Sequence, residues 1–109
     1  MGKINAVITG VGGWVPTYIL DNEEMSTIVD TSDEWIMERI GVKTRHILKP
    51  EEGAGTSFMM TKAVKQLLDK TGADPDSIEA VIVATTTPDY HFPSTASLII
   101  GSLDLKHAF

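Results

Sequence analysis

Residues 56–84 have the sequence TSFMMTKAVKQLLDKTGADPDSIEAVIVA. In the first half, apolar residues recur every three or four positions, the spacing of one helix face, and these residues are Met60, Ala63, Val64, Leu67 and Leu68. Gly72 ends the pattern. Residues 80–84 are apolar at every position, which predicts a central strand with helices on both faces. A helix followed by such a strand predicts an α/β fold.

The flanking segments predict further elements of the same fold. Residues 4–9 are short, β-branched and mostly apolar, and predict a strand that enters a tight turn at the glycines of residues 10–13. Ser94 is placed to cap a last helix. Residues 105–109 resemble the approach to another strand, so we expect an incomplete sheet.

Two short helices are expected between these segments. Asp21 or Asn22 is placed to cap the first, which we expect to end near Val29. Residues 31–34, Thr-Ser-Asp-Glu, repeat the capping pattern and begin a second helix that ends before a glycine at position 41. Residues 42–48 alternate as in a strand or an extended arm.

Spacing on the second helix pairs its side chains into two faces. Ile36 and Ile40 share one face, and Trp35 and Arg39 share another. An indole and a guanidinium one turn apart could together hold an aromatic ring and a phosphate. The alternative is that Trp35 belongs to the core and that Arg39 only complements the helix dipole.

Composition narrows the class of protein. The 109 residues have the hydrophobic and charged fractions, 42% and 22%, of one globular domain. The net charge of −6 argues against binding nucleic acid or an anionic membrane.

The sequence contains no cysteine, which excludes disulfides, thiolate metal sites and a cysteine nucleophile within these residues. No secretory signal is recognisable, so we expect a cytoplasmic protein. A local cluster of basic residues is nevertheless compatible with binding of an anionic small ligand. The cluster comprises Arg39, Lys43, Arg45, His46 and Lys49.

Other candidate motifs favour structural roles. The glycines at 10–13 lack the third fingerprint glycine of a dinucleotide site, because Val15 stands there. The three histidines, at positions 46, 91 and 107, are not spaced as metal ligands, and we expect neither a metal nor a cofactor. The polar run of residues 85–89, Thr-Thr-Thr-Pro-Asp, fits either a strand exit near a site or a solvated turn.

Four segments of the sequence together form a specific pattern. The most specific is residues 30–36, Asp-Thr-Ser-Asp-Glu-Trp-Ile, followed by Arg39, Gly41, Arg45 and His46. The others are GVGGWVP at residues 10–16, DSI with VIVATTTPD at residues 76–89, and FPSTA at residues 92–96. This pattern resembles the N-terminal part of β-ketoacyl-acyl carrier protein synthase III, the condensing enzyme that starts type II fatty acid synthesis. The resemblance spans the whole chain and implies that residues 1–109 are the N-terminal portion of a thiolase-like domain.

The resemblance also implies partners and site residues. In this family the residues at the positions of Thr31, Trp35 and Arg39 contact coenzyme A, through the base, the adenine ring and the phosphates respectively. The residue at the position of Phe92 lines the acyl pocket of the partner in a dimer. We therefore expect a homo-oligomer that uses a coenzyme A thioester and acyl carrier protein. The catalytic cysteine, histidine and asparagine of the family match no residue here.

These inferences lead to two hypotheses of different classes. Residues 1–109 are either part of an acyltransferase of this family, inactive by themselves, or a non-catalytic binding or interaction module. Within the first class, another thiolase-fold condensing enzyme, such as a polyketide starter enzyme, is the alternative.

Overall fold

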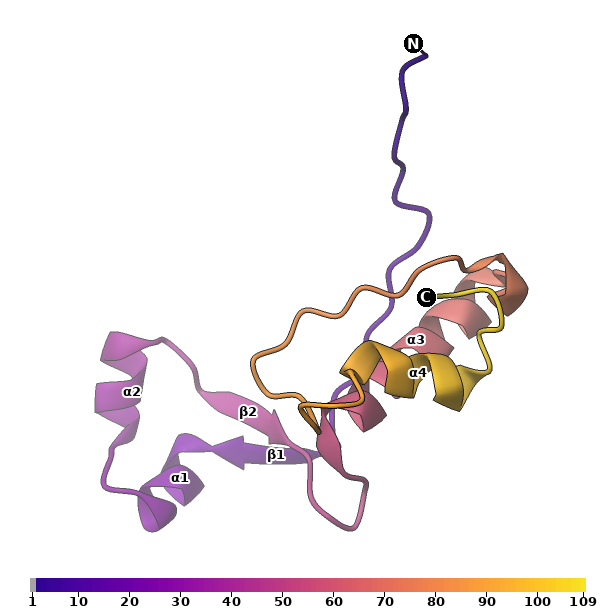
Figure 1. The fold of residues 1–109 in the computed structure, drawn as a ribbon. Coiled ribbons are helices and arrows are strands. Elements are labelled where there is room, and N and C mark those ends of the chain that lie inside the picture. Colours follow the sequence, from indigo (N-terminus) through magenta and orange to yellow (C-terminus); the bar gives the residue numbers. More distant parts are fainter. Residues whose placement is uncertain (1) are drawn as a thin grey trace. The chain divides into compact units, whose positions relative to one another are not determined.

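The structure, a computed structural model, describes residues 2–109 (Figure 1). The described chain divides into two compact units. One unit consists of Val15–Ala54, and the other of residues 2–14 together with Gly55–Phe109.

The unit formed by Val15–Ala54 is a two-stranded sheet with two short helices. Its elements in chain order are β1 (Tyr18–Asp21), α1 (Asn22–Ile28), α2 (Asp33–Arg39) and β2 (Thr44–Ile47). The strands are antiparallel, with Tyr18 opposite Ile47 and Asp21 opposite Thr44. Leu20 and Ile36 are the buried apolar side chains of this unit.

Both short helices begin at the predicted caps. The Asp21 carboxylate accepts a hydrogen bond from the Glu24 N–H at 2.8 Å, which makes Asp21 rather than Asn22 the cap of α1. The strand β1 was not predicted, because its pairing with β2 spans more than 20 residues. The predicted shared face of Ile36 and Ile40 is wrong. Ile40 lies beyond the last turn of α2 and is 66% exposed.

The other unit is built on two packed helices. Helix α3 (Gly55–Thr71) confirms the periodicity of residues 56–70, and it packs against α4 (Thr95–Leu103). A 3-10 helix, η1 (Pro75–Ser77), lies between them in sequence. The Ser94 hydroxyl accepts from the Ser97 N–H at 3.1 Å and caps α4 as predicted. Ile99 and Leu105 are the buried apolar side chains here.

Residues 10–13 form no turn, which corrects that expectation. The segment runs alongside α3, where the Gly13 N–H donates to Gln66 Oε1 at 3.2 Å and the Lys70 ammonium donates to the Val11 carbonyl at 3.2 Å. A Cβ at Gly12 would lie 2.7 Å from the Leu67 Cβ. The glycines therefore serve close approach to the helix rather than a reversal of the chain.

The predicted strands at residues 4–9 and 80–84 are also absent from the described structure. Both segments are apolar but largely uncovered, and Ile82 is 94% exposed. A strand requires a neighbour on its edge, and residues 79–81 have only Phe109. The Phe109 N–H donates to the Glu79 carbonyl at 3.2 Å, and the Val81 N–H donates to the Phe109 carbonyl at 3.0 Å. These two bonds have the pattern of a parallel pair, so the strand-like character predicted for residues 105–109 is present at its last residue.

Candidate functional site

Helix α2 is the element that carries the predicted binding residues. Ser32 accepts from the Trp35 N–H at 3.1 Å, and Asp33 and Glu34 place negative charge in the first turn. The helix ends where the Gly41 N–H donates to the Ile36 carbonyl at 3.1 Å, with Gly41 at a φ of 73°. Only glycine adopts this backbone conformation without strain. Local sequence therefore sets the residues at which α2 begins and ends.

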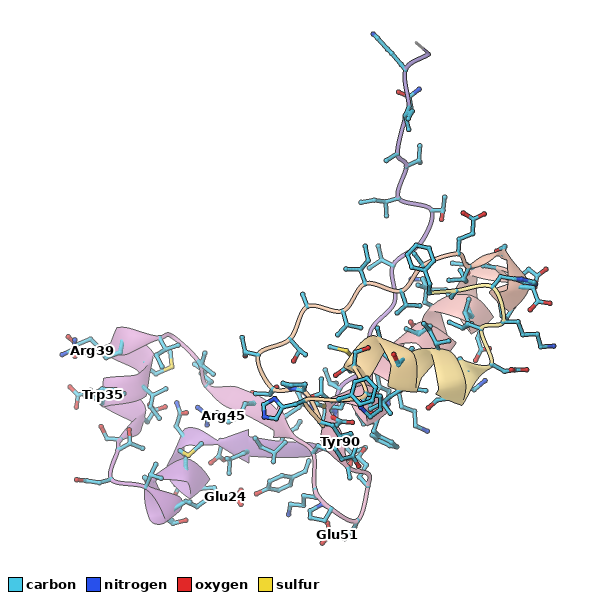
Figure 2. All side chains as sticks on the ribbon, in the orientation of Figure 1. Glu24, Trp35, Arg39, Arg45, Glu51 and Tyr90 are labelled. Carbon is cyan, nitrogen blue, oxygen red and sulfur yellow. The ribbon has the colours of Figure 1, made fainter. Side chains whose placement is uncertain are left out.

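Trp35 and Arg39 project together from one side of α2, which Figure 2 shows. The Arg39 Cζ atom lies 5.9 Å from the centroid of the Trp35 ring, within the range of a cation–π contact. The Trp35 side chain is 52% exposed, so the alternative that it belongs to the core is wrong. The helix instead packs through Ile36, which is 6% exposed.

Thr31 lies just before α2, beside a shallow pocket. The pocket has a volume of about 320 Å³ and is lined by Asp30, Thr31, Ser32 and Trp35. The Thr31 hydroxyl oxygen is buried and has no hydrogen-bond partner among residues 2–109. A larger depression of about 680 Å³ also includes Thr31, and its other lining residues are Asp21, Asn22, Glu23, Ser26, Ser32, Asp33, Lys43 and Thr44. The structure thus brings Thr31 and Trp35 to one pocket.

A buried amide connects α2 to the strands. Asn22 is 3% exposed, and its Nδ2 atom donates to Asp33 Oδ1 at 2.7 Å and to the Val42 carbonyl at 2.9 Å. Its Oδ1 atom accepts from Arg45 Nη2 at 2.7 Å. Sequence reasoning gave Asn22 only as an alternative cap. The partners lie 11 to 23 positions away, and no local pattern indicates them.

The basic cluster of the sequence does not form one patch. Arg45 is used by Asn22 and by the Leu20 carbonyl, and the Lys49 ammonium lies 3.6 Å from the centroid of the Tyr18 ring. The His46 Nδ1 atom lies 2.6 Å from the Pro16 carbonyl oxygen. Within residues 2–109, Arg39 and Lys43 form no salt bridge. Their charges remain available to an anion, and so does that of Lys49, because a ring contact such as that of Arg39 with Trp35 neutralises no charge.

The polar run at residues 85–89 has a structural role within its own unit. The Asp89 carboxylate accepts from the N–H groups of Thr56 and Ser57 at the start of α3 and from the Ser57 hydroxyl. The Ser57 hydroxyl lowers the pKa of Asp89, and the two N–H groups add to this effect, although burial acts in the opposite direction. The Thr56 hydroxyl donates to the Thr87 carbonyl. Asp89 therefore caps a helix that begins 34 residues earlier in the chain, at Gly55.

The remaining predicted positions lie in the same unit as α4. Phe92 is 90% exposed, and it is not among the residues that line a pocket of about 260 Å³ near the start of α4. His91 lines that pocket, and His107 is exposed. No group of three or more histidine, aspartate and glutamate residues within residues 2–109 could hold a metal ion. No described helix is long and apolar enough to cross a membrane.

The geometry of α2 therefore offers a flat aromatic surface, an adjacent cation and a nearby hydroxyl. An indole face binds another ring by stacking, and a guanidinium pairs with phosphate oxygens. No side chain in this set is a nucleophile or a base in contact with one. The arrangement is suited to holding a ligand that has an aromatic ring and negative charge.

Comparison with known proteins gives the fold and the proteins that this chain resembles in sequence. No family model matches the sequence. The structure superposes on 3-oxoacyl-acyl carrier protein synthase III from Aquifex aeolicus with a TM-score of 0.82 and 40% identity, covering 93% of this chain and 32% of that one. It also superposes on the priming β-ketosynthase of the R1128 polyketide pathway with a TM-score of 0.83 and 32% identity, covering 94% of this chain and 30% of that one. The fold is accordingly a partial thiolase-like fold.

Sequence comparison identifies curated relatives. A β-ketoacyl-acyl carrier protein synthase III of Bacteroides thetaiotaomicron is 72% identical over 109 residues, which are 100% of this chain and 32% of the relative. The chain is a homologue of β-ketoacyl-acyl carrier protein synthase III, and it spans about one third of the length of the curated relatives it matches. The resemblance drawn from the four sequence segments is thereby confirmed.

Proposed function

We propose that this chain supplies the coenzyme A-binding part of an acyltransferase that joins an acyl-coenzyme A primer to malonyl-acyl carrier protein. The observation that carries the proposal is the half-exposed Trp35 ring with Arg39 at 5.9 Å. Coenzyme A has an adenine ring next to phosphate groups, and this pair of side chains matches both features. The 72% identity to a synthase III of Bacteroides thetaiotaomicron supports the choice of reaction.

Thr31 supports the same ligand. A buried hydroxyl without a partner costs about 1–3 kcal/mol, and the Thr31 oxygen is such a group among the described residues. Thr31 and Trp35 line one pocket, so an adenine stacked on the indole would lie beside Thr31. A hydrogen bond to the base would remove that cost.

We assign the chemical step to groups outside this sequence. Acyl transfer in a condensing enzyme requires a thiolate nucleophile, and residues 1–109 contain no cysteine. The 109-residue chain alone is therefore expected to show no condensation activity. Both compact units belong, on this proposal, to the N-terminal portion of one thiolase-like domain.

The proposal includes partners and location. Acyl carrier protein is the second substrate, and the protein is a cytoplasmic homo-oligomer. Phe92, at 90% exposure, is a large apolar side chain available to line the acyl pocket of a partner subunit. The net charge of −6 agrees with a protein that binds neither nucleic acid nor an anionic membrane.

Two other candidate functions are each favoured by one observation. The 32% identity to a priming β-ketosynthase of a polyketide pathway favours a starter enzyme as the second candidate. The absence of cysteine from the sequence favours a non-catalytic binding module as the third. A malonyl-dependent condensation assay on the 109-residue chain tests the third candidate in one direction: measurable turnover would exclude it, whereas the absence of turnover is also what the first proposal expects.

Binding of coenzyme A to the protein, measured by titration calorimetry, tests the proposed site. Loss of a stacking aromatic costs about 1–3 kcal/mol, so Trp35→Ala should raise the Kd about 5- to 150-fold. Glu38→Ala, an exposed change on the same helix, is the matched control and should leave the Kd unchanged. Equal affinities of the Trp35→Ala variant and the unmodified protein would contradict the proposal.

A further inference from the structure

We propose that Asn22 is a positioning residue, which fixes α2 at both ends and so sets the orientation of Trp35 and Arg39 toward coenzyme A. The proposal rests on the proposed function for the identity of the ligand. The positioning role goes beyond the proposed function, because it assigns control of the site to a residue that does not contact the ligand.

The first step is the complete use of the Asn22 side chain. The residue is 3% exposed, and a buried amide must have partners for both its donor and its acceptor atoms. Nδ2 donates to Asp33 Oδ1 at 2.7 Å and to the Val42 carbonyl at 2.9 Å. Oδ1 accepts from Arg45 Nη2 at 2.7 Å. All three contacts have the geometry of strong hydrogen bonds.

The second step is the location of these partners. Asp33 is the first residue of α2, and Val42 follows three residues after its last residue. One side chain therefore holds the segments on both sides of the helix. Arg45 lies on β2 and also donates to the Leu20 carbonyl on β1 at 3.3 Å, which anchors Asn22 to the sheet.

The third step is the weakness of α2 without such contacts. Helices shorter than about 12–15 residues are marginal in water, and α2 has 7 residues. Its buried apolar contact is Ile36, which restrains the middle of the helix. Trp35 and Arg39 are exposed and project together from α2 (Figure 2), so their direction depends on how the ends of the helix are held.

The fourth step is the chemical fit of an amide at this position. Asp33 is a carboxylate and needs a donor, whereas Arg45 is a guanidinium and needs an acceptor. An amide supplies both from one side chain, and a carboxylate supplies only acceptors. Asn22→Asp would retain the contact with Arg45 but place two carboxylates at the 2.7 Å contact with Asp33. Repulsion would then displace the start of α2.

Two variants and a control isolate this effect. Asn22→Asp breaks the contacts with Asp33 and with the Val42 carbonyl, and the double change Asn22→Asp with Asp33→Asn restores only the first, with donor and acceptor exchanged. Asn5→Asp makes the same chemical change at an exposed position in the other unit. Asp33→Ala removes the hydrogen bond between Asn22 and Asp33, and it is the variant to measure if Asn22→Asp does not fold.

Hydrogen exchange and coenzyme A titration are measured on each variant. Amide exchange over residues 36–39 should accelerate at least tenfold in Asn22→Asp, while α3 amides stay unchanged. The Kd for coenzyme A should rise at least tenfold, and both effects should be partly reversed in the double variant, in which the contact with the Val42 carbonyl stays broken. Asn5→Asp should change neither quantity.

Different failures have different meanings. Unchanged exchange in α2 for Asn22→Asp would overturn the positioning role. Faster exchange with an unchanged Kd, while Trp35→Ala still weakens binding, would also overturn it, because α2 would be loosened without consequence for the ligand. If Trp35→Ala leaves the Kd unchanged, the proposed function fails, and exchange alone then decides whether Asn22 fixes α2.

Discussion

Replacing Gly12 by alanine should loosen the contact between residues 10–13 and α3. The added Cβ would lie 2.7 Å from Leu67 Cβ, 2.7 Å from Gln66 Oε1 and 3.0 Å from Leu67 Cα. The Gln66 side chain could rotate, but it would then lose the 3.2 Å hydrogen bond from Gly13. The Leu67 backbone is held within a 17-residue helix and cannot move alone. Overpacking of this kind costs about 1–3 kcal/mol in the free energy of unfolding.

Gly13→Ala is the matched control for this change. No atom lies within 4 Å of a Cβ at Gly13, and its backbone is not in the left-handed region. The substitution reduces the freedom of the unfolded chain and should be neutral or stabilise the protein by about 0.4–1 kcal/mol. Urea unfolding followed by circular dichroism measures both variants. The argument from close approach would be refuted if the two variants had the same unfolding free energy within about 0.5 kcal/mol.

Three further predictions concern single side chains. Ile99→Ala should lower the unfolding free energy by about 2–5 kcal/mol, because Ile99 is 1% exposed, whereas Ile82→Ala should change it by less than about 0.5 kcal/mol; urea unfolding compares them. Because the fold lowers the pKa of Asp89, the stabilisation by this carboxylate should be complete above the ordinary carboxyl pKa of about 3.9 and lost as the pH falls below that value. Asp89→Asn should flatten this acid dependence of the unfolding free energy, measured by urea titrations at several pH values. Lys65→Ala should change the midpoint of unfolding little, because the side chains of its ion pair with Asp69 are 65% and 67% exposed; a loss above about 1 kcal/mol would contradict this.

Local patterns predicted the helices, and non-local pairing explains what they missed. The apolar spacing of residues 56–70 and the Ser94 cap depend on contacts within a few positions, so both helices were found. The strands expected at residues 4–9 and 80–84 depend on neighbours elsewhere, and in the described structure only Phe109 pairs with residues 79–81. The strand β1 was missed because its pairing with β2 spans more than 20 residues.

In the candidate site, too, local contacts could be predicted from the sequence and non-local contacts could not. Spacing of four residues put Trp35 and Arg39 together, and the structure confirms it at 5.9 Å. Whether Trp35 was core or exposed could not be derived from α2 alone, because it depends on what packs against the helix. The contacts of Asn22 with Asp33 and Arg45 connect three elements, so they become visible only in the folded chain.

The claim that Trp35 stacks on the adenine of coenzyme A is tested most directly by its own fluorescence. The sequence has two tryptophans, and Trp14 contacts Phe58 edge to face at 5.6 Å in the other unit. In a Trp14→Phe background, Trp35 is the only indole emitter. Coenzyme A should quench it saturably, and the quenching curve should give the Kd measured by calorimetry. Emission that stays constant while calorimetry shows coenzyme A binding would contradict the account, because the ligand would then occupy a site away from Trp35.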